Sequence, residues 1–156
     1  YIIILLSTIV NGQLNSKNGL EIDPINNYSI SIGPLNETSN ELGITEENLQ
    51  KTVFSQLIDN KTPANENIME TFLLLNINCM AINYSDGRST GMYAYYVQAN
   101  FIRPIKFNYK DSIIEHSTAS VWNNFSSGFT NSSYIIIDDL IKIIDEFSNE
   151  LKSANK

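Results

Sequence analysis

Residues 71–83, TFLLLNINCMAIN, and residues 84–91, YSDGRSTG, decide the fold. Every second position of the first segment is apolar (Leu, Leu, Ile, Cys, Ala), the two-residue period of a strand that buries one face. The Asp-Gly pair at residues 86–87 favours a tight turn, so we expect the chain to return as an antiparallel strand over residues 92–105. The sequence therefore predicts a long β-hairpin at the centre of the domain.

Two amphipathic helices are predicted, one before this hairpin and one at the end of the chain. Thr45 can cap the first, whose opening turn carries two glutamates. Its buried stripe is expected at Leu49, Val53 and Leu57, widened by Phe54 and Ile58. The second lies within residues 133–156. Its apolar stripe consists of Ile136, Leu140, Ile143, Ile144, Phe147 and Leu151.

The remaining strands complete the expected architecture. Residues 28–35 alternate apolar and polar side chains up to a Gly-Pro pair, and residues 113–122 form a further strand that ends at Trp122, before a loop over residues 123–133. Residues 59–70 form a connection in which a short edge strand remains open. The predicted fold class is α+β, in the order β-α-β-β-β-α, with a largely antiparallel sheet of about four strands and two helices packed on one face.

Composition narrows the class of protein. The chain has 156 residues, which suits a single domain over residues 28–156. Its net charge of -7 is spread along the chain without a Lys/Arg cluster, which argues against nucleic-acid binding and against a polybasic membrane patch. The single cysteine permits no intrachain disulfide.

The first residues have the character of a targeting segment. Residues 1–12 open with YIIILLSTIV, an apolar run too short to span a bilayer and of the length of a signal-peptide core. Val10 and Gly12 occupy the small-residue positions before a cleavage point, and residues 13–27 read as a polar linker. The alternative is a buried N-terminal strand. We expect the remnant of a signal peptide, a periplasmic or secreted protein, and no transmembrane span in the mature chain.

The catalytic inventory is small. Cys79 and His116 are the candidates for a nucleophile and its base, but strand alternation places Cys79 on the apolar face and the two side chains in different registers. One histidine and one cysteine are too few for the usual zinc sets, so we expect no metal and no cofactor. The acidic pairs at 138–139 and 145–146 are interpreted as a solvated helix face. We therefore assign no catalytic residue.

Aromatic side chains supply the candidate contact residues. Tyr93 and Tyr95 lie on the predicted hairpin, where they can either bind a ligand or pack across strands. His116 and Trp122 precede a loop rich in Ser, Asn and Gly. These four residues are our candidates for contact with a ligand or partner.

Four stretches carry a resemblance to known sequences: LGITEENLQKTVFSQL, YAYYVQANF, ASVWNNFSSGF and IDDLIKIIDEFSNELKSAN. They resemble an uncharacterised family of small exported bacterial proteins with a G-[LI]-T-x-E-x-L-Q helix start, a Trp-ended strand before a Gly-containing loop, and a last helix with a D-E-F core. The matching positions are Gly43, Thr45, Glu47, Leu49, Gln50, Trp122, Gly128, Asp145, Glu146, Phe147, Leu151 and Asn155. The resemblance covers roughly residues 30–155.

This resemblance implies a compartment and a shape, because the family has no assigned activity. In the family the first helix usually continues as an arginine-rich stretch, whereas this chain reads FSQLIDNKTPA, so no function tied to those arginines carries over. The layout is also similar to the small α+β domains of envelope accessory proteins, such as the N-terminal domain of TolB-like proteins and transporter auxiliary lipoproteins. Likeness of fold alone says little about function.

The leading functional hypothesis is a non-enzymatic exported module of the cell envelope that binds another envelope protein or a cell-wall component. One alternative is a small hydrolase that uses Cys79 and His116. A second alternative is a carrier that holds a small apolar ligand between the sheet and the helices.

Overall fold

The structure, a computed structural model, describes residues 19–22, 24–65, 67–109 and 112–156. The described residues form four strands and three helices. The elements are β1 (Ser29–Ile32), α1 (Glu37–Glu41), α2 (Glu46–Asp59), β2 (Phe72–Asn83), β3 (Ser89–Tyr109), β4 (Ser112–Thr130) and α3 (Ser133–Ala154).

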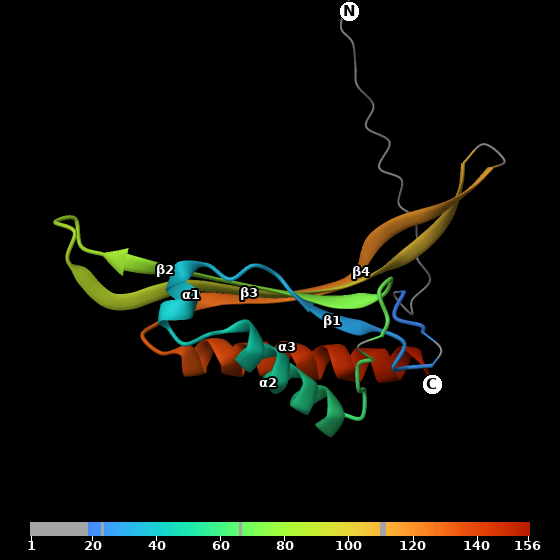
Figure 1. Cartoon of the computed structure of the whole chain (residues 1–156), viewed down its shortest axis with the longest axis horizontal. Coiled ribbons are helices and arrows are strands. Elements are labelled where there is room, and N and C mark those ends of the chain that lie inside the picture. The colour runs from blue at the N-terminus through green and yellow to red at the C-terminus, as the bar shows by residue number, and fades with distance from the viewer. Residues whose placement is uncertain (1–18, 23, 66, 110–111) are drawn as a thin grey trace, which may run out of the picture.

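The strands form a single sheet in the order β1-β2-β3-β4. β1 runs parallel to β2, whereas β2, β3 and β4 are joined by antiparallel pairing. Helices α2 and α3 lie against one face of this sheet, and the far end of the β3–β4 hairpin extends beyond the layer (Figure 1). The predicted α+β class and the order β-α-β-β-β-α are confirmed, with the short helix α1 as an addition.

Both long helices begin where capping chemistry predicts. The Thr45 hydroxyl accepts a hydrogen bond from the backbone N–H of Asn48 at the start of α2, and Ser132 caps α3 in the same manner. The predicted apolar stripes are buried at Leu49, Val53 and Leu57 on α2 and at all six predicted positions on α3. The expected widening of the α2 stripe is wrong at Ile58, which is 59% exposed because it points away from the sheet, while Phe54 is half-buried. Burial of these stripes against the sheet holds the two layers together.

Aromatic rings fill the centre of the core. The Phe147 ring on α3 lies 5.2 Å from that of Phe101 on β3 and 5.1 Å from that of Trp122 on β4, between ring centroids. Tyr28 meets Phe101 and Phe147 edge-on at 5.6 Å, and its hydroxyl donates a 2.6 Å hydrogen bond to the carbonyl of Thr62. These contacts join the sheet, α3 and the segment that follows α2.

Strands β3 and β4 are longer than the sequence predicts, whereas β1 is shorter. β4 does not end at Trp122: it continues to Thr130, and the expected loop over residues 123–133 is mostly strand. The reason is pairing with β3, because Val97, Tyr95 and Tyr93 lie opposite Ser126, Gly128 and Thr130. Small side chains leave room there for the Tyr95 ring.

The structure describes parts of two segments whose conformation the sequence leaves open, residues 59–70 and residues 13–27. The described residues between α2 and β2 form no strand, so the short edge strand considered there is absent from that part of the chain. Leu20 and Ile22, inside the stretch assigned as a linker, are buried in the core. Asn155 holds this segment, because its amide donates to the Leu20 carbonyl and accepts from the Ile22 N–H. The signal-peptide prediction for residues 1–12 lies outside the described residues.

Candidate functional site

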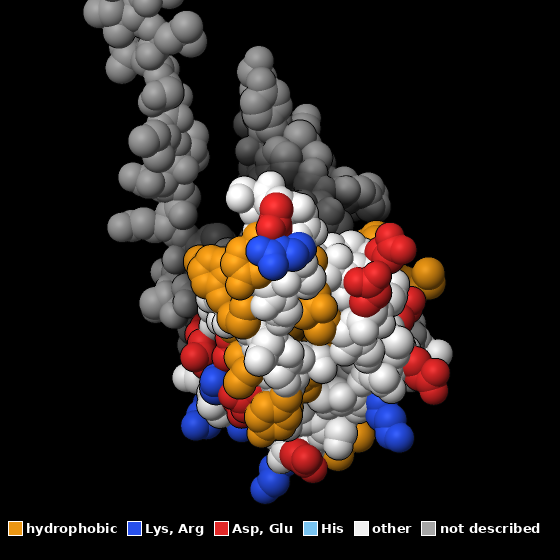
Figure 2. Space-filling view, turned by 90° about the vertical axis from the view of Figure 1, so that its left-hand side faces the viewer, with side chains coloured by type: hydrophobic (Ala, Val, Ile, Leu, Met, Phe, Trp, Pro, Cys, Tyr) orange, Lys and Arg blue, Asp and Glu red, His pale blue; other side chains and the backbone are white. Residues whose placement is uncertain are grey.

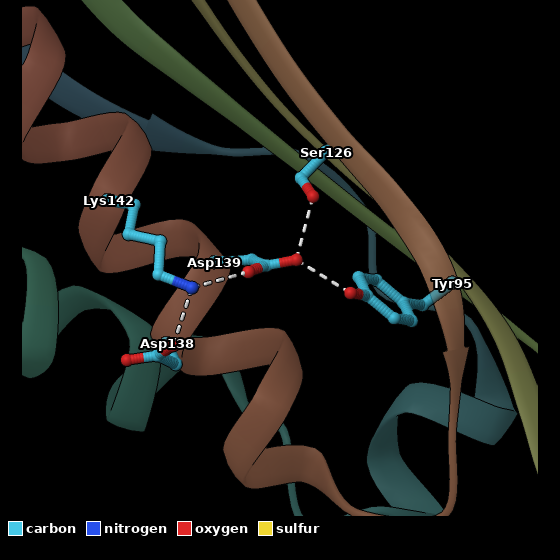
Figure 3. A network of polar contacts seen from close by, with 5 residues as sticks. All are labelled: Tyr95, Ser126, Asp138, Asp139 and Lys142. Carbon is cyan, nitrogen blue, oxygen red and sulfur yellow. Dashed lines mark hydrogen bonds and ion pairs between the residues drawn. The ribbon is translucent and has the colours of Figure 1, made fainter.

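A cluster of polar side chains lies between α3 and the sheet, around the carboxylate of Asp139 (Figure 3). Its Oδ2 accepts hydrogen bonds from the Tyr95 hydroxyl at 2.6 Å and from the Ser126 hydroxyl at 2.7 Å. Its Oδ1 lies 3.1 Å from the Lys142 ammonium, which also lies 2.7 Å from Asp138. One carboxylate on a helix therefore joins side chains from two strands.

Hydrogen bonding in this cluster holds each group in its ordinary charge state. The bonds from Tyr95 and Ser126 lower the pKa of Asp139, while the bond to Asp139 and burial raise the pKa of Tyr95. A general base needs a pKa near the working pH and a free lone pair directed at a substrate. Asp139 is a stabilised anion surrounded by donors, so the cluster suits a structural role.

The same arrangement repeats along α3. Two glutamates further along the helix also accept hydrogen bonds from side chains of β4. As the acceptors advance along α3, their donors move back along β4, so the helix and the strand run antiparallel. The pairs are Asp139 with Ser126, Glu146 with Asn124, and Glu150 with Trp122. We call these three pairs the helix–strand ties.

The interpretation of the acidic pairs as a solvated helix face is therefore wrong for Asp139 and Asp145, whereas the side chain of Glu146 is exposed as expected. Asp139 and Glu146 belong to the helix–strand ties. Asp145 accepts hydrogen bonds at 2.7 Å from the side-chain amides of Gln56 and Asn60, which join α3 to α2. Carboxylates next to a buried stripe can act as acceptors for the neighbouring layer.

The predicted contact residues fall mainly on the covered side of the sheet. Tyr95 and Trp122 are 8% and 7% exposed, and each donates a hydrogen bond to an acidic residue of α3. Tyr93 lies two residues before Tyr95 on the same face and is half-buried. The side chain of His116 lies outside the part of the chain that the structure describes. Only a small part of Tyr95 and Trp122 is accessible to a ligand.

Cys79 is buried and separated from His116. Its side chain is 1% exposed, and burial raises the pKa of the thiol. Cys79 pairs with Tyr95, which pairs with Gly128 on β4, twelve positions from His116 along that strand. At 3.3 Å per residue the two backbones lie roughly 40 Å apart. This register does not form a thiol–imidazole pair.

The opposite side of the sheet has a different composition. We call it the open face: the outward side chains of residues 29–32, 72–82, 92–102 and 120–129, over which neither α2 nor α3 lies (Figure 1). None of the residues in these four ranges is charged, in a chain of which 17% is charged. The open face is therefore a neutral surface.

The part of the open face nearest the β2–β3 turn is apolar and aromatic. Met80, Phe125 and Phe129 are 66%, 59% and 72% exposed. The rings of Tyr96 and Phe125 lie 5.8 Å apart at 31°, and Phe129 is paired with Ala94, next to Tyr96 on β3. Figure 2, which views this end of the molecule, shows hydrophobic side chains gathered at the surface. A contiguous exposed apolar patch marks an interaction site more often than scattered residues do.

A shallow depression of about 430 Å³ lies within this patch. Residues 78–80 of β2 and 94–96 of β3 line it, and no helix residue does, so it opens on the open face. There the side chains of Asn78, Met80 and Tyr96 surround it, while Cys79 and Tyr95 point into the core. Sequence reasoning missed this patch, although Phe125 and Phe129 share the odd-numbered register that points away from Trp122.

Two further classes of site are absent from the described residues. No group of three or more His, Cys, Asp or Glu side chains there is placed to hold a metal ion. Within the same residues, no helix has both the length and the apolar composition of a membrane span. The sequence matches no protein-family model and none of the curated proteins.

Proposed function

We propose that this protein is a non-enzymatic, exported module of the bacterial cell envelope that binds another envelope component through its open face. The observation that carries the proposal is the neutral, partly aromatic surface on the side of the sheet opposite α2 and α3. The resemblance to small exported proteins and the apolar start of the chain support the periplasmic or secreted location.

The alternatives find less support. The hydrolase needs Cys79 and His116 together, and the strand register separates them. The apolar-ligand carrier needs space between the sheet and the helices, where Tyr28, Phe101 and Phe147 are fully buried and in ring contact. The depression on the open face is the better placed cavity.

The test compares two charge insertions of equal exposure. Phe125→Lys places an ammonium on the open face, and Ile58→Lys places one on α2; both native side chains are 59% exposed. Each immobilised variant is incubated with solubilised envelope from the source cells after its folding has been checked by circular dichroism. We expect Phe125→Lys to lose a component that the native protein and Ile58→Lys retain. Equal retention by both variants contradicts the proposal.

A further inference from the structure

We infer that the ligand of the open face is a neutral polysaccharide strand of the cell wall, an inference that rests on the proposed function. The pairing register divides this face into two parts. Toward the β2–β3 turn it carries Met80, Ala94 and Phe129, and toward the other end it carries the amides of Gln98, Asn100 and Asn123. Tyr96 and Phe125 lie between the two parts.

The aromatic pair suits the flat side of a sugar ring. A pyranose presents C–H groups on its faces, and these pack favourably on the negative face of an aromatic ring. The Tyr96 and Phe125 rings lie 5.8 Å apart between centroids and are inclined by 31°, so together they form one aromatic surface, which we call the platform, beside the depression. A platform of this kind accommodates a chain of rings better than a single small ligand.

The amides suit the edge of a sugar ring. Each hydroxyl both donates and accepts hydrogen bonds, and a carboxamide offers both functions on one side chain. Among the described residues, the amides of Gln98, Asn100 and Asn123 make no hydrogen bond to the rest of the chain. Asn100 and Asn123 face each other across β3 and β4, and Asn123 lies two residues before Phe125 on β4. They are available to a ligand that lies across the strands.

The lack of charged residues on the open face favours a neutral ligand over an anionic one. An anionic polymer requires Lys or Arg, and the open face has neither, on a chain of net charge -7. An apolar protein surface would cover the Met80 part but would leave the amides desolvated without partners. A neutral glycan satisfies both parts of the face.

The experiment measures binding of two neutral probes, cellohexaose and chitohexaose, with polygalacturonate as the anionic probe. Titrations are followed in ¹⁵N-labelled protein through the side-chain amide signals of Gln98 and Asn100. We expect a neutral probe to shift these signals, and Tyr96→Ala to weaken that binding by about tenfold or more, since central aromatic anchors dominate interfaces. Tyr134→Ala on α3, where the native ring is 73% exposed, should leave the affinity unchanged.

Three results overturn the inference: neither neutral probe binds at millimolar concentration, polygalacturonate binds as well as they do, or Tyr96→Ala binds as tightly as the native protein. The envelope extract separates this failure from failure of the proposed function. If capture depends on Phe125 but survives only in the protein fraction and not in protease-treated wall glycan, the binding module stands and its glycan ligand is wrong. If neither fraction shows dependence on Phe125, both proposals are contradicted.

Discussion

Replacement of Tyr95 by phenylalanine tests the Asp139 cluster that seats α3 on the sheet. The change removes one hydroxyl, and with it the 2.6 Å hydrogen bond to the carboxylate, and keeps the ring over Gly128. Hydrogen bonds to charged groups contribute about 1.5–3 kcal/mol net. Asp139 keeps Ser126 and Lys142, and its side chain is 16% exposed, so water can replace part of the loss. We expect the free energy of unfolding to fall by about 1.5 kcal/mol at pH 7.

The pH dependence of this loss identifies its origin. The Tyr95 hydrogen bond is the largest cause of the lowered pKa of Asp139. A carboxyl group whose folded-state pKa is depressed stabilises the fold above its unfolded-state pKa, near 3.9, and that stability disappears as the pH falls through the folded-state pKa. The difference between Tyr95→Phe and the native protein should therefore be full at neutral pH and should shrink in strong acid.

The assay is urea unfolding followed by circular dichroism, at pH 7 and at successively lower pH. Tyr134→Phe is the matched control, because that tyrosine lies on α3 with its ring 73% exposed and should change stability by less than about 0.5 kcal/mol. The reasoning fails if Tyr95→Phe is as stable as the control variant at pH 7. It also fails if the destabilisation is the same in strong acid as at neutral pH.

Three other predictions concern packing and burial. Gly128→Ala should cost about 1–3 kcal/mol in thermal unfolding, because its Cβ would lie 3.0 Å from the Tyr95 hydroxyl oxygen; native stability would contradict this contact. Phe147→Ala should cost about 3–5 kcal/mol in urea unfolding and shift the emission of Trp122 to longer wavelength, and a loss below about 1 kcal/mol would contradict the aromatic core. The Cys79 thiol should react with iodoacetamide only as fast as the protein unfolds, and rapid alkylation of the native protein would show an accessible thiolate.

The helices and the hairpin were predictable because local signals and burial agree there. Thr45 caps α2, the α3 stripe is apolar at helical spacing, and residues 86–87 form the expected turn between β2 and β3. The five-residue helix α1 has no apolar periodicity of its own. Its signal is only the Asn36 cap, whose side chain accepts from the N–H of Ser39 and donates to the carbonyl of Cys79.

The end of β4 was missed because its inward-facing positions are polar. Asn124 and Ser126 occupy inward-facing sites where an apolar residue would indicate a strand. Gly128 has no side chain, and the Tyr95 ring occupies the space that a side chain would fill. Their partners, Glu146 and Asp139, come from a helix whose place is set only by the tertiary fold. The burial of Tyr95 and Trp122, and their hydrogen bonds to acidic residues of α3, could not be predicted for the same reason.

Hydroxyl-radical footprinting of the free protein is the most direct test of the claim that one side of the sheet is covered and the other is open. Phe125 and Phe147 are the informative pair, since the same ring chemistry is 59% exposed on the open face and fully buried between α3 and the sheet. We predict rapid oxidation of Phe125 and Met80, and slow oxidation of Phe147 and Trp122. Protection of Phe125 to the level of Phe147 would contradict the open face and the function proposed for it.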